Sequence, residues 1–291
     1  MITKIATPNR EEWKNLRHQY IGGSDAAAVV GLNPFSSAYS LWAEKTDRVP
    51  PFEGNLATEV GTYLEDFVAK KFEEETGKKV RRENHSILND AYPWAIANVD
   101  RVVVGEDAGL EIKTTSELNM KSFKNGEYPS NYYAQCVHYL ALTGKRRWYL
   151  AVLIGNKEFK WFTIERDQDE IDALMAAEEN FWKCVTDGVP PEADGSKATT
   201  DAIKTIYTTS NNDQVSLFSF DDCLKQYIEL GKQVKELQNL QNEMANKVKA
   251  FMGAAGKGES DHYKVSWSTV VKKGYYVNES TSRQFRVTAK N

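Results

Sequence analysis

The segment from residue 98 to residue 113 constrains the fold of this chain more than any other, because its end alternates like a β-strand. Successive side chains of a strand point to opposite faces, so Leu110 and Ile112 are expected to face a core. Glu111 and Lys113 then share the other face. The strand thus carries a carboxylate and an ammonium group side by side.

A second strand is expected just upstream, where residues 97–104 are rich in β-branched side chains. The stretch 105–109, bounded by two glycines, supplies the turn. If that turn is symmetric, Asp100 lies across from Lys113 and diagonal to Glu111, because opposed residues of an antiparallel pair point to the same side. The sequence therefore predicts a hairpin that gathers two carboxylates and a lysine at one place.

Asp100, Glu111 and Lys113 are the residue types that metal-dependent phosphodiester hydrolysis needs. Carboxylate oxygens are the ligands that Mg²⁺ or Mn²⁺ prefers, and magnesium keeps water positions that supply a nucleophile. A nearby ammonium group orients that water and offsets charge that develops on phosphorus. The spacing alone is a loose pattern, and a solvated Glu–Lys pair on an exposed strand face is the alternative.

Composition excludes several classes of protein. With 41% hydrophobic residues and seven Trp in 291 residues, the chain has ample material for a core and is not disordered as a whole. No stretch approaches the roughly 18 apolar residues that span a bilayer, and the start has no apolar signal segment, so we expect a soluble intracellular protein. Cys136, Cys184 and Cys223 form no Cys-x-x-Cys pair, which argues against a disulfide framework or a zinc site.

The net charge of −4 is unexpected for a protein that grips nucleic acid, because phosphate contacts normally supply most of the affinity. Its distribution matters more than its sum. Residues 225–291 hold twelve Lys and Arg against six Asp and Glu, so the acidic excess lies in residues 1–224. An acidic body is typical of a carboxylate-lined metal site, and a basic tail is typical of a surface that binds a phosphate backbone.

The order of helical and strand-like patterns predicts an α/β (α+β) fold, in which a central mixed sheet is flanked by helices. Ser24 or Asp25 is the expected N-cap of a short helix that follows Gly22-Gly23. The other expected helices are 10–18, 37–46, 58–76, 131–143 and 169–187, and the expected strands are 87–88, 95–104, 110–114, 147–155 and 158–165.

The Pro-rich stretch 190–196 is the expected domain boundary, with residues 1–195 as the main domain and 196–291 as a linker, a long helix and a small basic β tail. Residues 263–271 and 284–288 are expected to form the strands of that tail. An apolar spacing of about 3.5 residues predicts that the long helix packs on a partner or on the body. The positions with that spacing are Leu224, Ile228, Gly231, Val234, Leu237, Met244, Val248 and Phe251.

Five short blocks occur in an order that resembles the phage lambda exonuclease/YqaJ-type viral recombinase family, a branch of the restriction-endonuclease-like nucleases. The resemblance covers about residues 10–190, and the order of the blocks makes it far more specific than any one of them. The blocks are Leu16-Arg17 with Ile21-Gly22-Gly23-Ser24-Asp25, then Gly61-Thr62-Tyr63-Leu64-Glu65, Asn98-Val99-Asp100, Leu110-Glu111-Ile112-Lys113 and Tyr133-Ala134-Gln135-Cys136-Val137-His138-Tyr139.

The resemblance implies a restriction-endonuclease-like core with the metal-binding motif Asp…Glu-x-Lys. Asp100 and Glu111 would then hold Mg²⁺, with Mn²⁺ as a substitute, and the main-chain carbonyl of Ile112 would be a further ligand. Glu65 would assist from its helix, although an exposed helix carboxylate is the simpler interpretation of that residue. Lys113 would position the attacking water.

The resemblance also implies a pocket for a 5′-terminal phosphate. Arg17 and Ser24 match that pocket, and a guanidinium group, a hydroxyl group and helix N–H groups together suit an anion. Gln135 aligns with the same pocket, and Asn98 stands where the lambda enzyme has a serine. The arginine expected after the Glu-x-Lys strand is missing, and Lys121 is its expected substitute. The alternative for Arg17 and Ser24 is a solvent-facing arginine beside an ordinary N-cap. The alternative for Gln135 is a surface amide on its helix.

The function implied by the resemblance is a metal-dependent 5′→3′ exonuclease that digests one strand of linear double-stranded DNA and leaves a 3′ overhang for a phage-type single-strand annealing protein. Family members form rings, so a trimer or tetramer is expected, encoded by a phage or prophage and active in the bacterial cytoplasm. Two alternatives remain open: a non-catalytic DNA-end-binding protein that loads the annealing partner, and an endonuclease on the same scaffold.

The C-terminal tail is a candidate for an accessory DNA-binding element. Trp267, Tyr275 and Tyr276 lie among three lysines and would stack on bases of a single strand. Burial of these aromatic rings against the long helix is the alternative. The lysines are Lys264, Lys272 and Lys273.

Overall fold

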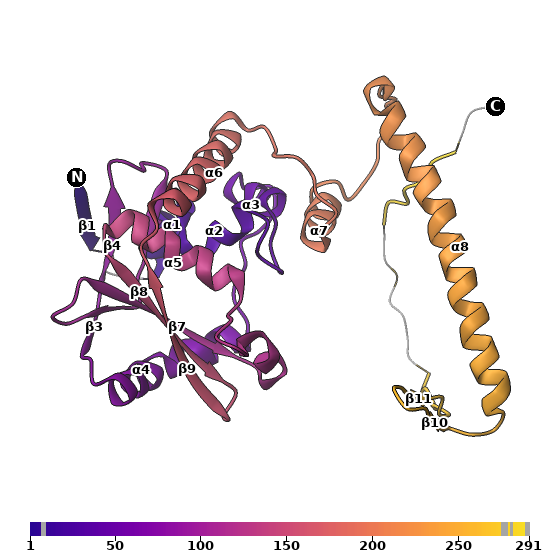
Figure 1. Cartoon of the computed structure of the whole chain (residues 1–291). Helices are drawn as coiled ribbons and strands as arrows, with labels where there is room; N and C mark the ends of the chain where they lie inside the picture. The colour runs from indigo at the N-terminus through magenta and orange to yellow at the C-terminus, as the bar shows by residue number, and fades with distance from the viewer. Residues whose placement is uncertain (7–9, 275–278, 280–281, 289–291) are drawn as a thin grey trace. The chain divides into compact units, whose positions relative to one another are not determined.

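The structure is a computed structural model that describes residues 1–6, 10–274, 279 and 282–288 (Figure 1). The chain forms two compact units, Met1–Ile206 and Tyr207–Asn291. The first unit ends later than residue 195, because α7 (Lys197–Ile206) packs against α3 (Ala38–Lys45). A buried hydrogen bond of 2.7 Å between the hydroxyl groups of Ser37 and Thr199 joins the two helices.

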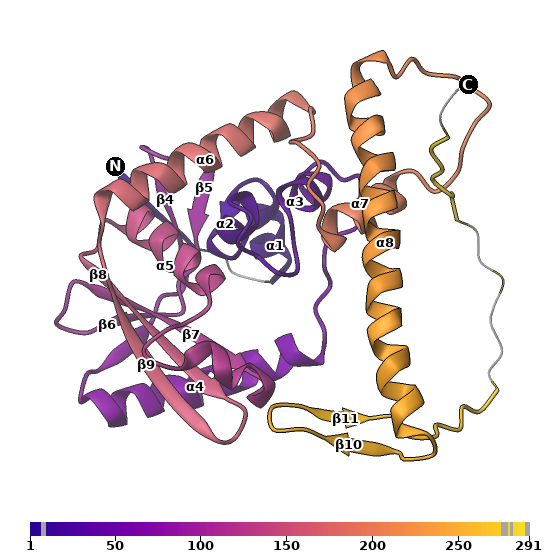
Figure 2. The same ribbon diagram turned by 45° about the vertical axis from the view of Figure 1, so that its right-hand side comes forward.

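A five-stranded mixed sheet forms the centre of the first unit, as predicted (Figure 2). The two longest central strands, β7 and β8, run parallel, and their neighbours are antiparallel. The strand order is β3 (Val80–Arg82), β6 (Arg101–Val103), β7 (Ala108–Thr115), β8 (Arg147–Ile154) and β9 (Glu158–Glu165).

A second sheet contains the other strands of this unit, and it corrects the prediction of one strand over residues 95–104. The chain leaves the second sheet after β5 and enters the central sheet at β6, so the segment 98–100 lies between two sheets. The order of the second sheet is β1 (Ile2–Ala6), β4 (His85–Asn89), β5 (Ala95–Ala97) and β2 (Ile21–Gly22).

The β6–β7 hairpin has a shorter turn than expected. Arg101 pairs with Leu110, so Asp100 falls opposite Glu111 and the expected register, with Asp100 opposite Lys113, is wrong by two residues. Side chains alternate with a period of two, so a shift of two residues leaves each side chain on its face. Asp100 therefore still lies on the Glu111 face of the sheet.

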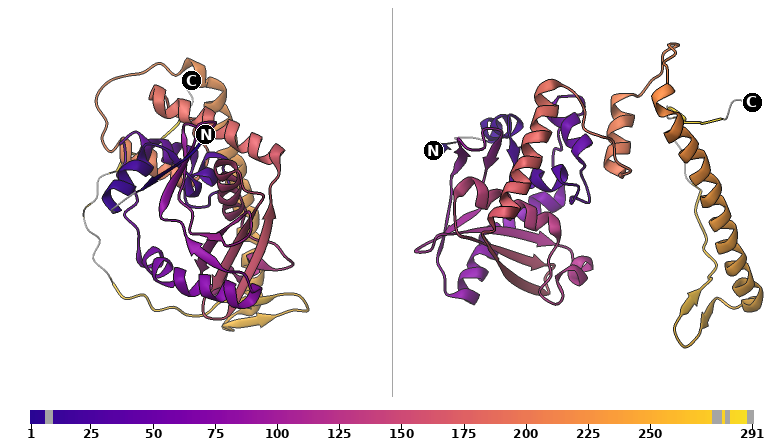
Figure 3. Two further views of the ribbon diagram at one scale, coloured as in Figure 1. Left: turned by 90° about the vertical axis from the view of Figure 1, so that its left-hand side faces the viewer. Right: turned by 45° about the horizontal axis from the view of Figure 1, so that its top comes forward.

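The central sheet is covered on both faces (Figure 2, Figure 3). Along β8, Trp148 and Leu150 belong to the core under α5 (Ser130–Thr143) and α6 (Gln168–Asp187), as predicted for helices in these places. Tyr149 and Ala151 belong to the core under α4 (Leu56–Thr76). Leu110 joins the α4 core, so the opposite face of β7 points toward α5.

The helix α1 (Arg10–His18) precedes β2, and the helix α2 (Gly23–Val29) follows β2 and packs against α5. The N-cap of α2 is Gly22, and neither Ser24 nor Asp25 has that position. Asp25 is the third helical residue, and its Oδ2 accepts a hydrogen bond of 3.1 Å from the Gly22 N–H group. The acidic side chain therefore satisfies a backbone donor at the helix start from within the helix.

The second unit contains the predicted long helix, α8 (Asp221–Met252), after a short η2 turn (Phe218–Phe220). The β tail differs from the prediction: it pairs β10 (Lys257–Glu259) with β11 (Lys264–Ser266), and residues 284–288 form no strand. Tyr275 and Tyr276 lie outside the described residues. Among the residues that are described, no helix has both the length and the apolar character to cross a membrane.

Candidate active site

The predicted carboxylates meet beside the centre of β7. Glu111 is only 2% exposed, which excludes a solvated Glu–Lys pair on an open strand face. Asp100 ends the segment between the two sheets, and its Oδ2 accepts a hydrogen bond of 2.8 Å from the N–H group of Ile112. This bond holds the Asp100 carboxylate against the strand that carries Glu111.

Lys113 and Gln135 close a triangle with Glu111. The Lys113 ammonium lies 2.6 Å from Glu111 Oε1 and donates to Gln135 Oε1 at 2.8 Å. The Gln135 amide group donates in turn to Glu111 Oε1 at 2.8 Å. Gln135 is buried on α5, so it is not the surface amide that was the alternative. The Gln135 amide thus holds Lys113 through its oxygen and Glu111 through its nitrogen.

One oxygen of this cluster has no partner. Glu111 Oε2 is buried and accepts no hydrogen bond from the described residues. Burial raises the pKa of Asp100 well above its ordinary value, and the nearby charge of Glu111 raises it further. Burial lowers the pKa of Lys113, but the two carboxylates raise it by more. A buried carboxylate, Glu111, and a half-buried one, Asp100, thus share one ammonium group, and a further positive charge would stabilise them.

The strand edge beside Asp100 adds a third oxygen. The strand β6 begins at Arg101, opposite Leu110, so the residues of β7 after Leu110 have no β6 partner on that side. The N–H and C=O groups of one strand residue point to the same neighbour. The Ile112 N–H group binds Asp100, so the Ile112 carbonyl opens toward the same side. Two carboxylates and a carbonyl are the oxygen set that fits Mg²⁺ or Mn²⁺.

Glu65, on the helix from which it was expected to assist, has an ion-pair partner. It lies on α4 and pairs with the guanidinium group of Arg101, which is 3% exposed and also donates to the Asp100 carbonyl at 2.7 Å. Its charge adds to the rise in the pKa of Asp100. Within the described part of the chain, no three His, Cys, Asp or Glu side chains are grouped to hold a metal ion. The structure therefore brings Glu65 to Arg101 rather than into the carboxylate pair.

The predicted phosphate-binding pair is assembled at the start of α2. Arg17 donates to Ser24 Oγ at 2.5 Å and to Asp25 Oδ1 at 3.2 Å. The Lys45 ammonium lies 2.9 Å from Asp25 Oδ2 and donates to the carbonyl groups of Arg17 and Tyr20 at 3.1 and 2.8 Å. Asp25 thereby orients the guanidinium group toward the Ser24 hydroxyl.

Sequence reasoning missed the role of Lys45. Burial raises the pKa of Asp25, but Lys45 and Arg17 lower it more, to about 2. Lys45 follows Leu41 by four residues on α3, so it lies on the buried face of that helix. A lysine on an apolar helix face needs a carboxylate partner, and this position was the available signal.

Tyr139 connects the two clusters. Its hydroxyl group donates to the Asn98 carbonyl at 2.9 Å and accepts from the Gln135 amide at 2.8 Å. A Cβ at Gly23 would lie 2.5 Å from the Tyr139 ring, so only glycine lets α2 approach α5 this closely. The Asn98 side chain accepts a hydrogen bond of 2.6 Å from the Ser86 hydroxyl. The structure therefore links the start of α2 to the carboxylate cluster through one tyrosine.

Lys121 is the predicted residue that the structure does not bring to these clusters. It is exposed on the η1 turn (Glu117–Phe123) that follows β7. No hydrogen bond or ion pair of the described residues joins Lys121 to Arg17, Ser24 or Gln135. Its role at a phosphate stays a prediction.

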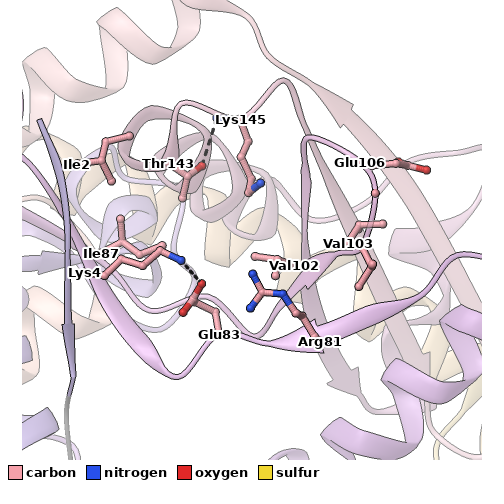
Figure 4. A pocket seen from close by; sticks show the side chains of 12 residues that line it. Ile2, Lys4, Arg81, Glu83, Ile87, Val102, Val103, Glu106, Thr143 and Lys145 are labelled. Atoms are coloured by element: carbon pink, nitrogen blue, oxygen red, sulfur yellow. Dashed lines mark hydrogen bonds and ion pairs between the residues drawn. The ribbon is translucent and has the colours of Figure 1, made fainter.

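A surface hollow of about 390 Å³ lies away from this site (Figure 4). Residues of β1, β3, β4 and β6 line it, and none of the predicted site residues is among them. Lys4 and Glu83 pair across one side of the hollow, where Arg81 adds a second cation. This hollow is therefore not the place of the clustered carboxylates.

The comparisons with known proteins agree with this geometry. The YqaJ-like viral recombinase domain matches residues 12–146, and the uncharacterized protein YqaJ of Bacillus subtilis (strain 168) is 40% identical over 277 residues, 93% of this chain and 87% of the relative. The chain belongs to the YqaJ-like viral recombinase family. The family supports a nuclease in recombination, and the predicted resemblance is confirmed.

Solved structures confirm the predicted fold class. The alkaline exonuclease LHK-Exo from Laribacter hongkongensis is 21% identical, with a TM-score of 0.53, and the match covers 62% of this chain and 94% of that chain. The same enzyme in complex with dAMP gives a TM-score of 0.52 at the same identity and coverage. The family member described here therefore has the restriction-endonuclease-like fold of these enzymes.

Proposed function

We propose that this protein is a Mg²⁺-dependent exonuclease that digests one strand of linear double-stranded DNA in the 5′→3′ direction and leaves a 3′ overhang. The observation that carries the proposal is the unpartnered Glu111 Oε2, buried beside Asp100, Lys113 and the open edge at Ile112. The family match and the fold that the chain shares with an alkaline exonuclease support the same class of reaction.

Asp100, Glu111 and the Ile112 carbonyl would hold the cation, and Mn²⁺ would substitute for Mg²⁺. When bound, such a cation clamps the scissile phosphate and lowers the pKa of a water molecule. The Lys113 ammonium orients the attacking water and offsets charge on the phosphorus. Gln135 holds the Lys113 and Glu111 side chains in this arrangement, so neither has to reorganise during the reaction.

The 5′ end of the digested strand would bind near the start of α2. The Arg17 guanidinium group and the Ser24 hydroxyl group already point at one another and would grip a terminal phosphate together. Gln135, Asn98 and Lys121 would complete the grip. Because Tyr139 joins this pair to the carboxylates, a bound 5′ end would set the scissile phosphate at the metal-binding residues.

The same proposal includes partners. A phage-type single-strand annealing protein would take over the 3′ overhang, in the cytoplasm of a bacterium that carries the phage or prophage. A homo-oligomeric ring, a trimer or a tetramer, would keep an acidic body on its DNA, since a closed heterologous interface can encircle a duplex.

The decisive experiment compares linear duplexes with a 5′-phosphate and a 5′-hydroxyl, each with Mg²⁺ and with EDTA. We expect rapid digestion only with Mg²⁺ and with a 5′-phosphate. Equal rates on both ends would contradict the Arg17–Ser24 assignment, and digestion in EDTA would contradict the metal-dependent mechanism.

Two variants and one substrate separate the alternatives. Glu111→Ala should lose digestion and keep DNA binding, whereas the exposed control Glu179→Gln should keep both. An unmutated protein that binds DNA ends but digests nothing with Mg²⁺ would favour the end-binding role. Cleavage of covalently closed circular DNA would favour an endonuclease.

A further inference from the structure

The helix α8 carries an apolar stripe that is exposed over most of its length. At its start Tyr227 packs edge-on against Phe285, and the apolar side chains that follow remain exposed. Leu230, Val234, Leu237, Met244 and Val248 are between 45% and 66% exposed. None of the 32 residues of this helix is buried. Large apolar side chains gathered on one face of a helix are typical of an interaction surface.

The stripe follows a heptad repeat with alternating steps of three and four residues. Seven of the eight positions are apolar, and Gln241 is the exception. A strict seven-residue repeat differs from the 3.6-residue period of a straight helix and imposes a left-handed supercoil on two helices. The a positions are Tyr227, Val234, Gln241 and Val248, and the d positions are Leu230, Leu237, Met244 and Phe251.

We infer that α8 pairs with α8 of a second copy of this chain in a parallel two-stranded coiled coil. Of the two ring sizes proposed above, pairing of the chains two by two fits the tetramer. Valine at a positions with leucine at d positions favours two strands. The flanking e and g positions carry no pair of like charges that would oppose self-association: they hold Gln226, Gly231, Gln233, Gln238, Leu240, Ala245, Lys247 and Met252.

Gln241 sets the direction and the register of the two helices. In a parallel pair with full overlap, each Gln241 faces the same residue of the second copy, and the two amide groups satisfy one another. In an antiparallel pair each a position faces a d position, so in the register with the most overlap Gln241 would face Leu230 and lose its hydrogen bonds. A shallow groove beside it, lined by Val234, Leu237, Gln238 and Gln241, suits an inserted side chain of the second copy.

Cys223 provides a direct test of this arrangement. It is exposed and lies four residues before Tyr227, at the d position of the preceding heptad. A parallel pair brings the two Cys223 residues face to face, at a separation that a disulfide bond spans. In the antiparallel pair with the most overlap, each Cys223 lies opposite Val248, 25 residues and about 38 Å from the other cysteine.

The experiment oxidises the full-length protein mildly with diamide and follows the cross-linked product on a non-reducing gel. We expect nearly complete conversion to a product of two chains, and no product from Cys223→Ser. Cys136 is buried, so it is an internal control. Leu237→Glu should abolish the product, whereas Asn239→Glu, on the outer face of the helix, should leave it.

The other outcomes overturn the inference in distinguishable ways. No product from the unmutated protein overturns the parallel pair. Conversion that stops at about two thirds reveals three strands, because each disulfide bond joins two thiols and leaves the third free. The nuclease assay is independent of this result: retained digestion without cross-linking would remove the coiled coil and leave the proposed function in place.

Discussion

Asp25 and Glu111 are both buried carboxylates beside lysine, and they differ in how completely they are satisfied. Both oxygens of Asp25 have partners, from Arg17, Gly22 and Lys45, and its pKa falls to about 2. Glu111 has one oxygen in contact with Lys113 and Gln135 and one with no partner. The first arrangement stabilises the fold, and the second holds an unfavourable charge that the proposed cation would relieve.

An unpartnered buried oxygen is not sufficient evidence for a metal site. Among the described residues Glu178 Oε2, in the core between α5 and α6, also has no hydrogen-bond partner. Its other oxygen lies 2.8 Å from His138 Nδ1, and His138 Nε2 donates to the Ile96 carbonyl at 3.0 Å. This acid has a titratable partner, and the carboxylate whose charge reaches it, Asp25, is itself paired with Lys45 and Arg17. Glu111 differs because Asp100 and an open strand edge lie beside it.

The sharpest test of the comparison is Glu111→Gln. The amide keeps the shape and the Oε1 contacts but removes the charge, so digestion should fall by roughly 10⁴-fold or more. Folding should suffer little, since Lys113 keeps the Asp100 charge beside it and the repulsion between the two carboxylates is removed. The free energy of unfolding should therefore stay within about 1 kcal/mol of the unmutated value. Urea unfolding measures the stability, and the digestion rate on a 5′-phosphorylated duplex measures the activity. Strong destabilisation would show that Glu111 is structural.

Asp25→Asn, in contrast, should lower the free energy of unfolding strongly. It leaves the Lys45 ammonium buried without a counter-charge, and breaking a buried ion pair costs about 3 to 5 kcal/mol of unfolding free energy. The double variant Asp25→Asn/Lys45→Met should recover most of this loss, because it removes both charges. Urea unfolding of the set measures the coupling. Equal stability of Asp25→Asn and the unmutated protein would contradict it.

The fold could be predicted from sequence where local patterns decide. The helices α4, α5, α6 and α8 and the strands β8 and β9 are confirmed, because their apolar periods extend over many residues. The single strand over 95–104 was wrong, because the change from one sheet to another depends on long-range pairing. The predicted register of the β6–β7 hairpin was also wrong, because the sequence of the turn fits more than one turn geometry and the geometry of the turn sets the register.

The candidate site, too, could be predicted where a local pattern decides and could not where contacts between distant elements decide. The convergence of Asp100, Glu111 and Lys113 was predictable, because a period of two residues fixes the face even when the register is shifted. The pairing of Arg101 with Glu65 and the role of Lys45 depend on contacts between elements far apart in sequence. A single sequence carries no signal for such a pair beyond a charged residue on an apolar face.

The low pKa of Asp25 should make the free energy of unfolding depend on pH. Its pKa lies at about 2 in the folded protein, below the usual 3.8, so the folded state binds fewer protons than the unfolded state between these values. This contribution, about 2 kcal/mol, is present above about pH 5 and is lost as the pH falls toward 2. The unfolding free energy from pH 5 to pH 2 should therefore fall more steeply for the unmutated protein than for Asp25→Asn/Lys45→Met. Parallel curves would contradict the low pKa.

The smallest expected effect falls on the connection between the two regions. Tyr139→Phe removes the hydroxyl group that links the Asn98 carbonyl to the Gln135 amide, and the loss should cost about 1 kcal/mol of unfolding free energy. The ring remains, so the contact with Gly23 and the packing of α2 on α5 are kept. Tyr63→Phe, on an exposed tyrosine of α4, is the matched control.

The functional signature of Tyr139→Phe should exceed its effect on stability. Without the hydroxyl group, Gln135 loses one of the partners that hold it between Lys113 and Glu111, and the 5′-phosphate pair is no longer tied to the carboxylates. The preference for a 5′-phosphate over a 5′-hydroxyl end should therefore narrow, even where digestion persists. A variant that keeps the full preference while losing stability would show that the tyrosine holds the two regions together but does not couple them.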